Sequence, residues 1–426
     1  MSYVRYAFGL GAVLLAPMLS SRPALAHARW FVDDKQLPPG PDFQLDRIYA
    51  SILVGGLAFV IGAIFLEATS RRNAAFYRAL RQPIRAESNT VWRILSVTFG
   101  LTLIVSSMTR VLVAPNLPAG PGPAVQVIMF LQIIIGSIFV IQSRLMVGSA
   151  LAALLPFSCA WLYSVTQAID YAFEVAGFSA ALFLVGPSLS VADRDLQAQL
   201  FARSPIGLTL RIQTRSRSFC CAWRTSRRDG STPGRWQRER LAASILRTLL
   251  GLQLVVLAAH DKLLEPAVSL AFVGKYPFVN FPALLGATGF TNLHFVFAAG
   301  IAEVTFGALL MANVATRAVS AILTVMFVAT GIAFGVGELV GHLPIVAALL
   351  VLMAHGSGKA APVTFESWQT LFLGAAGVAA AVLLFAVFTP SNHPTRVPSA
   401  DAPTAVPGAL YGRRISNLPR FSAGPT

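Results

Sequence analysis

The chain has 426 residues, of which 55% are hydrophobic and only 12% are charged, and its mean hydropathy is +0.66. This is more apolar side chain than a soluble fold of this length buries, so we expect lipid to cover the excess. The formal net charge of +15 comes from basic residues that are concentrated in a few segments between apolar runs. Such a distribution indicates loops that orient a membrane protein and argues against a nucleic-acid partner.

The first 26 residues have the pattern of a secretory signal peptide. A basic residue near the start is followed by an apolar stretch up to Leu19 and by the small-x-small cleavage site Ala24-Leu25-Ala26. Cleavage would make His27 the first residue of the mature chain and would leave 27–46 as an extracytoplasmic segment. The α-amine and imidazole of an amino-terminal histidine form a chelating pair suited to copper(II).

Beyond the signal peptide, about ten segments are apolar enough and long enough to cross a bilayer, which needs about 20 residues per helix. We therefore expect an all-α, polytopic membrane protein. The predicted spans lie near residues 48–66, 93–113, 124–142, 146–166, 171–188, 242–260, 292–312, 318–337, 341–355 and 368–388.

The basic segments agree on one orientation. Signal cleavage leaves the new amino terminus outside, and because the spans then alternate, every basic segment falls on the inner side. The longest of them carries eleven arginines between Val191 and Arg240, and we expect it to be a linker that contacts lipid headgroups.

Two regions of the chain have matching patterns. The hexapeptide that begins at Gly100 aligns with the one that begins at Gly251, and Gln132-x-x-x-Gly136 resembles Glu303-x-x-x-Gly307. This predicts an internal duplication into two parallel four-helix units, related by an axis along the membrane normal.

The duplication predicts the organisation of the whole chain, with one flanking helix on each side of the two units. A proline-rich tail follows, which we expect to be disordered outside the membrane. The predicted segments are the signal peptide 1–26, the outer segment 27–46, the first span with its basic inner loop 47–91, the first unit 92–188, the arginine-rich linker 189–240, the second unit 241–358, the last span 367–388 and the tail 389–426.

Ionisable side chains within spans are costly to place in lipid, so they are the first candidates for a functional site. In the first unit Asp170 and Glu174 open the fifth span, but the histidines of the second unit have no counterparts there. We therefore expect the site in the second unit or between the two units. The candidates for an intramembrane or outer-mouth site are Glu303, Glu338, His342, His260, Asp261, Lys262 and His294.

Four histidines on the expected outer side are candidate metal ligands: His27, His260, His294 and His342. Imidazole nitrogen binds zinc and copper, and nearby carboxylates can complete such a site. No H-x-x-x-H spacing exists within one helix, so a metal site requires convergence between helices. The alternative is that these histidines cap helices or pair with Asp261 and Glu338 and bind no ligand.

Three motifs of the second unit carry a resemblance to a known family. They are Ala259-His260-Asp261-Lys262-Leu263-Leu264-Glu265-Pro266, Ala299-Gly300-Ile301-Ala302-Glu303-Val304-Thr305-Phe306-Gly307 and Glu338-Leu339-Val340-Gly341-His342-Leu343-Pro344. With them, residues 246–358 resemble the DoxX-like membrane proteins, four-helix units associated in some members with a quinol-oxidising terminal oxidase. The family pattern has Ser-Glu-Lys where this chain has His260-Asp261-Lys262. The resemblance implies a multi-pass protein of the bacterial inner membrane with a link to respiratory or thiol redox chemistry.

Three functions remain open at this point. The first is an accessory subunit of a redox membrane complex, in which Glu303, Glu338 and His342 line a cavity for quinone or protons and a redox membrane protein is the partner. The second is binding or transport of copper, zinc or a small solute. The third is a structural or assembly role without a ligand. We expect no catalytic activity from the chain alone, because haem and flavin motifs are absent from it.

Overall fold

The computed structural model describes residues 37, 41, 43, 46–70, 88–113, 117, 119–163, 165–203, 233–287 and 289–356. All of them belong to one compact unit of the chain, Met1–Ala375. The predicted signal peptide, His27, the last span 367–388 and the tail 389–426 lie outside the described residues. So does most of the arginine-rich linker, at 204–232.

The described residues form helices and contain no strand, as the all-α prediction requires. Nine helical segments among them are long and apolar enough to cross a membrane, and the chain is a multi-pass membrane protein. The helices are α3 (Arg47–Ser70), α5 (Ser88–Met108), α6 (Pro123–Ile141), α7 (Leu145–Ala152), α8 (Leu155–Leu162), α9 (Val165–Leu189), α10 (Val191–Arg203), α13 (Pro233–Ala258), the π-helix η3 (Ala259–Leu264), α14 (Pro266–Lys275), the 3₁₀ turn η4 (Pro277–Val279), α15 (Phe281–Leu284), α16 (Asn292–Ala312), α17 (Thr316–Phe334) and α18 (Val336–His355).

The first nine predicted spans correspond to these helices, and the three largest differences concern the fourth, fifth and sixth spans. The fourth span is divided into α7 and α8, and Pro156 lies at the start of the second piece, where its missing N–H costs no internal hydrogen bond. The fifth span begins earlier than predicted, at Val165, and the sixth extends back to Pro233. Parts of the segment predicted as a linker are therefore helical.

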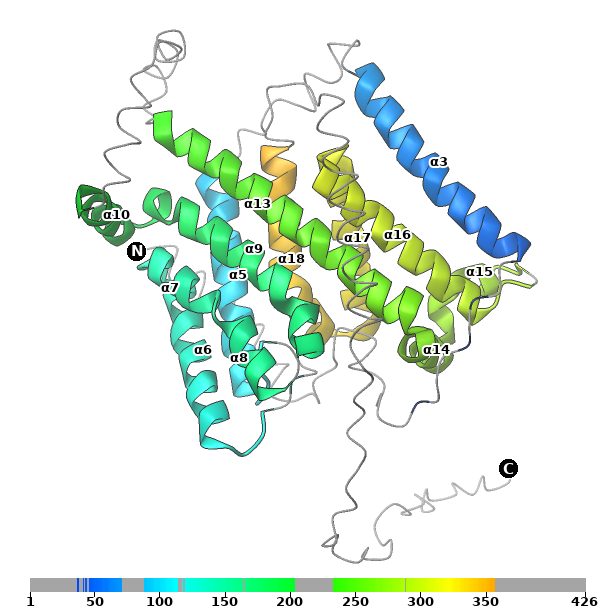
Figure 1. Ribbon diagram of the computed structural model, residues 1–426, viewed down its shortest axis with the longest axis horizontal. Helices are drawn as coiled ribbons and strands as arrows, with labels where there is room; N and C mark the ends of the chain where they lie inside the picture. Colours follow the sequence, from blue (N-terminus) through cyan, green and yellow to red (C-terminus); the bar gives the residue numbers. More distant parts are fainter. Residues whose placement is uncertain are drawn as a thin grey trace, which may run out of the picture. The chain divides into compact units, whose positions relative to one another are not determined.

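The helices pack in two matching sets. In the first, α5 contacts α6, and α7 and α8 contact α9; in the second, α13 contacts α16, and α17 contacts α18. The sets are interlocked, because α5 also packs against α18 and α13 packs against α9. Figure 1 shows α13 between α9 and α16, with α3 beside α16.

Close glycine contacts hold the first pair of helices together in each set. A Cβ atom on Gly100 would lie 2.5 Å from the carbonyl oxygen of Gly136, and one on Gly136 would lie 2.6 Å from that of Gly100. Gly251 and Gly307 make the same reciprocal contact, at 2.6 and 2.5 Å. Small residues let backbones approach closely in membranes, where van der Waals packing drives helix association. These four glycines therefore determine how near α5 lies to α6 and α13 to α16.

Candidate functional site

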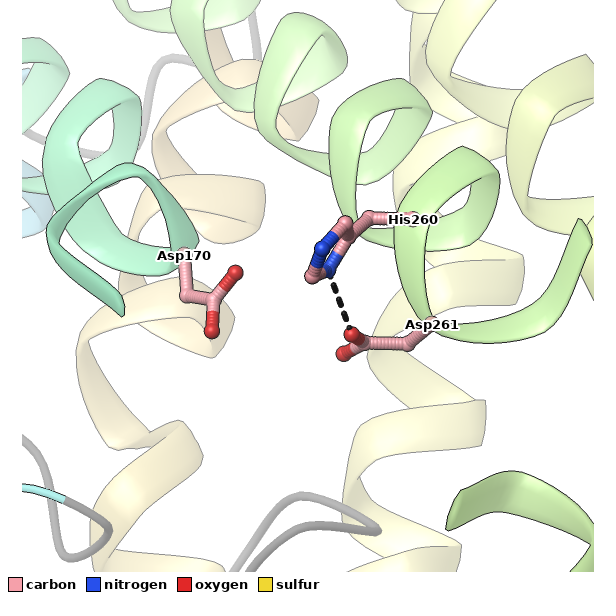
Figure 2. Close-up of side chains that lie close together, drawn as sticks. All are labelled: Asp170, His260 and Asp261. Carbon is pink, nitrogen blue, oxygen red and sulfur yellow. Dashed lines mark hydrogen bonds and ion pairs between the residues drawn. The ribbon is translucent and has the colours of Figure 1, made fainter. Parts of the chain in front are cut away.

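Asp170, His260 and Asp261 form a compact cluster (Figure 2). One ligand atom from each lies within 4.8 Å of the other two, and the described residues contain no other such group of three or more His, Cys, Asp or Glu side chains. Asp170 comes from α9, whereas His260 and Asp261 come from the π-helix that continues α13. Both carboxylates are buried, with 3% and 7% of the residue exposed. The cluster therefore joins the two interlocked helix sets in a low-dielectric environment.

The π-helix η3 determines where the histidine and aspartate of the cluster point. Six residues after Ala258 have π-helical geometry, and the segment ends where α14 begins at Pro266. His260 Nδ1 lies 2.9 Å from Asp261 Oδ1, and the Ser269 hydroxyl donates a 2.9 Å hydrogen bond to the carbonyl oxygen of Asp261. Short π-helical segments are rare in proteins as a whole, but those that occur frequently lie at functional sites. They change the direction in which side chains leave the helix.

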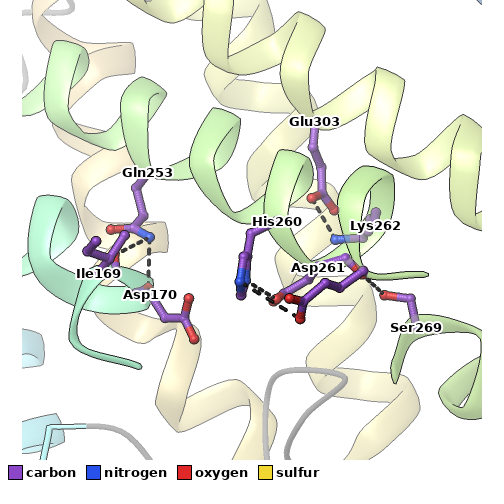
Figure 3. A network of polar contacts seen from close by, with 9 residues as sticks. Ile169, Asp170, Gln253, His260, Asp261, Lys262, Ser269 and Glu303 are labelled. Carbon is purple, nitrogen blue, oxygen red and sulfur yellow. Dashed lines mark hydrogen bonds and ion pairs between the residues drawn. The ribbon is translucent and has the colours of Figure 1, made fainter. Parts of the chain in front are cut away.

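Gln253 holds the helix that supplies Asp170 (Figure 3). Its Nε2 donates to the carbonyl oxygens of Asp170, at 2.7 Å, and Ile169, at 3.4 Å. Its Oε1 accepts from the backbone N–H groups of Phe173 and Glu174, both at 3.1 Å. The buried carboxamide of α13 therefore contacts four backbone groups of α9.

Lys262 and Glu303 form an ion pair beside the cluster, with Nζ and Oε2 2.7 Å apart. They join the π-helix to α16, and 23% of each side chain is exposed. Glu303 thus meets a cation at the end of the neighbouring helix, which neutralises its charge within the span.

Glu338 and His342 pair on α18. Glu338 Oε1 lies 3.5 Å from His342 Nδ1, both residues are buried, and the imidazole packs on the Phe327 ring with 4.7 Å between centroids. The expected shared helical face is present. These contacts join Glu338 to His342 and His342 to α17, whereas Glu303 contacts Lys262. A common cavity of Glu303, Glu338 and His342 therefore stays a prediction.

His294 has a structural environment at the start of α16. Its Nδ1 accepts a 3.0 Å hydrogen bond from the Thr291 N–H, and the Thr291 hydroxyl accepts from the His294 N–H, which completes a capping box. Its Nε2 lies 3.0 Å from Asp46 Oδ2, at the start of α3. The N–H of Tyr49 donates to the Asp46 carboxylate, which with His294 and Ile48 lowers the pKa of this group. His294 therefore anchors α3 to α16, in line with the capping alternative.

The predicted site residues thus fall into four groups rather than one. His260 and Asp261 lie together, Lys262 pairs with Glu303, Glu338 pairs with His342, and His294 pairs with Asp46. Of the candidate histidines in the described part of the chain, His260 belongs to the group of side chains that could hold a metal ion, and His294 and His342 do not.

Asp170 was not among the predicted site residues, although it completes the cluster. The sequence contains one indication of its role, because Asp170 is a carboxylate at the edge of a predicted span. It belongs to the predicted first unit, however, whereas His260, His294 and His342 belong to the predicted second unit. No protein-family model matches this chain, and no match is found among the curated proteins or the solved structures.

Proposed function

We propose that this multi-pass membrane protein binds a divalent transition-metal ion with Asp170, His260 and Asp261. The observation that carries the proposal is the mutual proximity of three ligand atoms, within 4.8 Å, from two different helices. Metal bonds to imidazole nitrogen and carboxylate oxygen are about 2.0–2.2 Å long, which places neighbouring ligand atoms roughly 3–4 Å apart. Small side-chain rotations therefore suffice to close the group around an ion.

The donor set limits which ions fit. One imidazole nitrogen and two carboxylates suit Zn²⁺, Mn²⁺ and Fe²⁺, whereas copper(I) prefers sulfur ligands. Three protein ligands leave further coordination positions for water or another ligand. Binding or handling of a metal ion is therefore the function that this geometry favours.

The proposal includes the internal duplication, which would place the metal site between the two units. Matching backbone turns support it. Gln142 and Asn313, six residues after Gly136 and Gly307, have φ of 58° and 59°. Arg144 and Ala315, two residues further on, have φ of 51° and 47°. Positive φ is uncommon for residues other than glycine, so its recurrence at the same spacing supports the duplication.

Matching polar contacts provide independent support. Four residues before Gly100, the Ser96 hydroxyl donates to the carbonyl of Phe139 at 2.8 Å. Four residues before Gly251, Arg247 donates to the carbonyl of Leu310 at 2.6 Å. Both acceptors lie three residues after the partner glycine. The interlocking of α5 with α18 and of α13 with α9 fits two units that exchange their fourth helices.

Two finer assignments rest on the sequence alone. The relation of residues 246–358 to the DoxX-like proteins is proposed on its three motifs, and the bacterial inner membrane is proposed on the signal peptide and the positive-inside rule. Under that orientation the metal site faces the outer side of the membrane.

The test is metal analysis of the purified full chain after reconstitution with Mn²⁺, Fe²⁺ or Zn²⁺ and removal of excess ion. We expect about one ion per chain, lost in Asp170→Asn and in His260→Ala. Asp195→Asn is the matched control, because Asp195 is an exposed carboxylate on α10 and its replacement should leave the metal content unchanged. A wild-type chain that retains none of these ions, or variants that retain them fully, would refute the proposal.

A further inference from the structure

Gln253 contacts α9 in an unusual way. In an α-helix the N–H of residue 173 pairs with the carbonyl of 169, and that of 174 with the carbonyl of 170. The Gln253 carboxamide contacts both members of these two successive pairs. A side chain that inserts into this hydrogen-bond ladder fixes the local direction of the helix.

The shortest of these hydrogen bonds reaches the backbone of Asp170, which is one of the three proposed metal ligands. The 2.7 Å hydrogen bond from Gln253 Nε2 reaches the carbonyl oxygen of Asp170, and Gln253 is almost fully buried, with 2% exposed. Gln253 also lies seven residues before His260 on the same continuous helix, α13 with η3. The segment that supplies His260 and Asp261 therefore also holds the backbone of Asp170.

The corresponding position of the first unit provides a contrast. Thr102 stands two residues after Gly100, as Gln253 stands two residues after Gly251. Thr102 also contacts the fourth helix of the other unit, through one 3.2 Å hydrogen bond to the Val340 carbonyl. In this register, Thr109 and Arg110 stand where the second unit has His260 and Asp261. At this position Thr102 contacts the opposite helix through one hydrogen bond, whereas Gln253 contacts four backbone groups beside the cluster.

We propose that Gln253 is a positioning residue that sets the distance of the Asp170 carboxylate from His260 and Asp261 and thereby the metal affinity. This inference rests on the proposed metal-binding function. Groups that orient metal ligands through hydrogen bonds typically change affinity about 10–100-fold when they are replaced. Gln253 exerts its effect from outside the ligand set, through the backbone of α9.

The experiment measures Mn²⁺ affinity and the Mn²⁺ electron paramagnetic resonance spectrum of the full chain in detergent. Gln253→Met keeps the side-chain length and removes all four hydrogen bonds, and we expect it to weaken binding about 10–100-fold and to alter the spectrum. Thr102→Val is the matched control at the equivalent position and should leave both readouts unchanged.

A double-mutant cycle separates positioning from a general structural effect. Asp170→Asn should lose its ion when excess ion is removed, so the weaker affinity that remains is measured by titration with excess Mn²⁺. If Gln253 acts through Asp170, Gln253→Met should not lower this remaining affinity further. Equal fold-losses in both backgrounds would overturn the inference. If Gln253→Met does not fold, Gln253→Glu replaces it, because this variant keeps the acceptor for two N–H groups and loses the amide donor. Wild-type affinity in the Glu variant would overturn the inference as well.

The two proposals can fail separately. A wild-type chain that does not bind Mn²⁺, Fe²⁺ or Zn²⁺ refutes the metal site itself. Normal binding by wild type, loss in Asp170→Asn and unchanged affinity in Gln253→Met would retain the metal site and refute the role of Gln253.

Discussion

The helices that begin the two proposed units, α5 and α13, end in different ways. α5 stops at Met108, and Arg110 follows with φ of 58°. α13 instead continues as a π-helix, which places His260 and Asp261 opposite Asp170. Similar glycine contacts precede both ends. One packing framework can therefore support a plain turn or a cluster of carboxylate and imidazole side chains, depending on how the last helical turn is built.

The two proposed units also carry different residues at an equivalent position, Gln132 in the first and Glu303 in the second. Gln132 is neutral, and its carboxamide bonds the carbonyl of Leu103 and the N–H of Val113, each at 3.0 Å. Glu303, at the corresponding place, is charged and needs the cation of Lys262. The first unit thus satisfies this position through backbone groups, whereas the second requires a partner side chain, which ties α16 to the π-helix.

The glycine contacts provide the largest test of the shared framework. Gly251→Val places side-chain carbons against the Gly307 carbonyl, and we expect a loss of about 3 kcal/mol or more of unfolding free energy. Gly100→Val should cost a similar amount, because its contact with Gly136 has the same geometry. Thermal unfolding in detergent measures both. Gly55→Val on α3 is the control, since a Cβ there meets no atom within 4 Å, and an equal loss there would contradict the explanation.

Glu303→Gln tests the difference between the units by giving the second unit the neutral side chain of the first. It leaves the Lys262 cation without its partner, and we expect a loss of about 1–3 kcal/mol, less than for a fully buried pair because 23% of each side chain is exposed. The double variant Lys262→Met with Glu303→Gln should recover most of this stability. Chemical unfolding curves of the wild type, the two single variants and the double variant measure the coupling between Lys262 and Glu303. If the losses of unfolding free energy of the single variants simply add in the double variant, the result would argue against the ion pair.

Removing the hydrogen bonds that Arg247 and Ser96 donate tests the same comparison, with smaller expected losses of unfolding free energy. Arg247→Met removes donors from the carbonyls of Leu310 and Met311 and should cost about 1–3 kcal/mol. Ser96→Ala removes one neutral hydrogen bond to Phe139 and should cost about 1 kcal/mol. Unfolding free energies compare them directly. A larger loss in Ser96→Ala than in Arg247→Met would reverse the expected order.

Replacement of Asp46 should have the smallest effect on stability. Asp46 joins α3 to α16 of the second proposed unit, and it has no equivalent in the first. Its pKa is lowered in the folded chain, mainly by the hydrogen bond from the Tyr49 N–H. The stability that this group contributes is therefore present above its usual pKa and is lost as the pH falls through the lowered value. We expect the stability difference between wild type and Asp46→Asn to shrink between about pH 5 and pH 3. A difference that does not change with pH would contradict this assignment.

Much of the fold follows from the sequence, because hydropathy is a local property. The predicted span 292–312 has the same bounds as α16, and the pairing of Glu338 with His342 follows from helical spacing. The break between α7 and α8 and the π-helix at Ala259 were not predicted, because they depend on local backbone geometry that apolar composition does not specify. The role of His294 was foreseen as the capping alternative, but its partner Asp46 was not.

The apolar spans and the set of ionisable residues that a membrane makes costly follow from the sequence alone. Only the tertiary structure decided which of these residues meet. Asp170 and His260 lie far apart in the sequence, on opposite sides of the arginine-rich linker. They come together because α13 packs against α9 and because Gln253 donates a hydrogen bond to the backbone carbonyl of Asp170. Such convergence depends on interhelical packing, which the hydropathy of each single helix does not record.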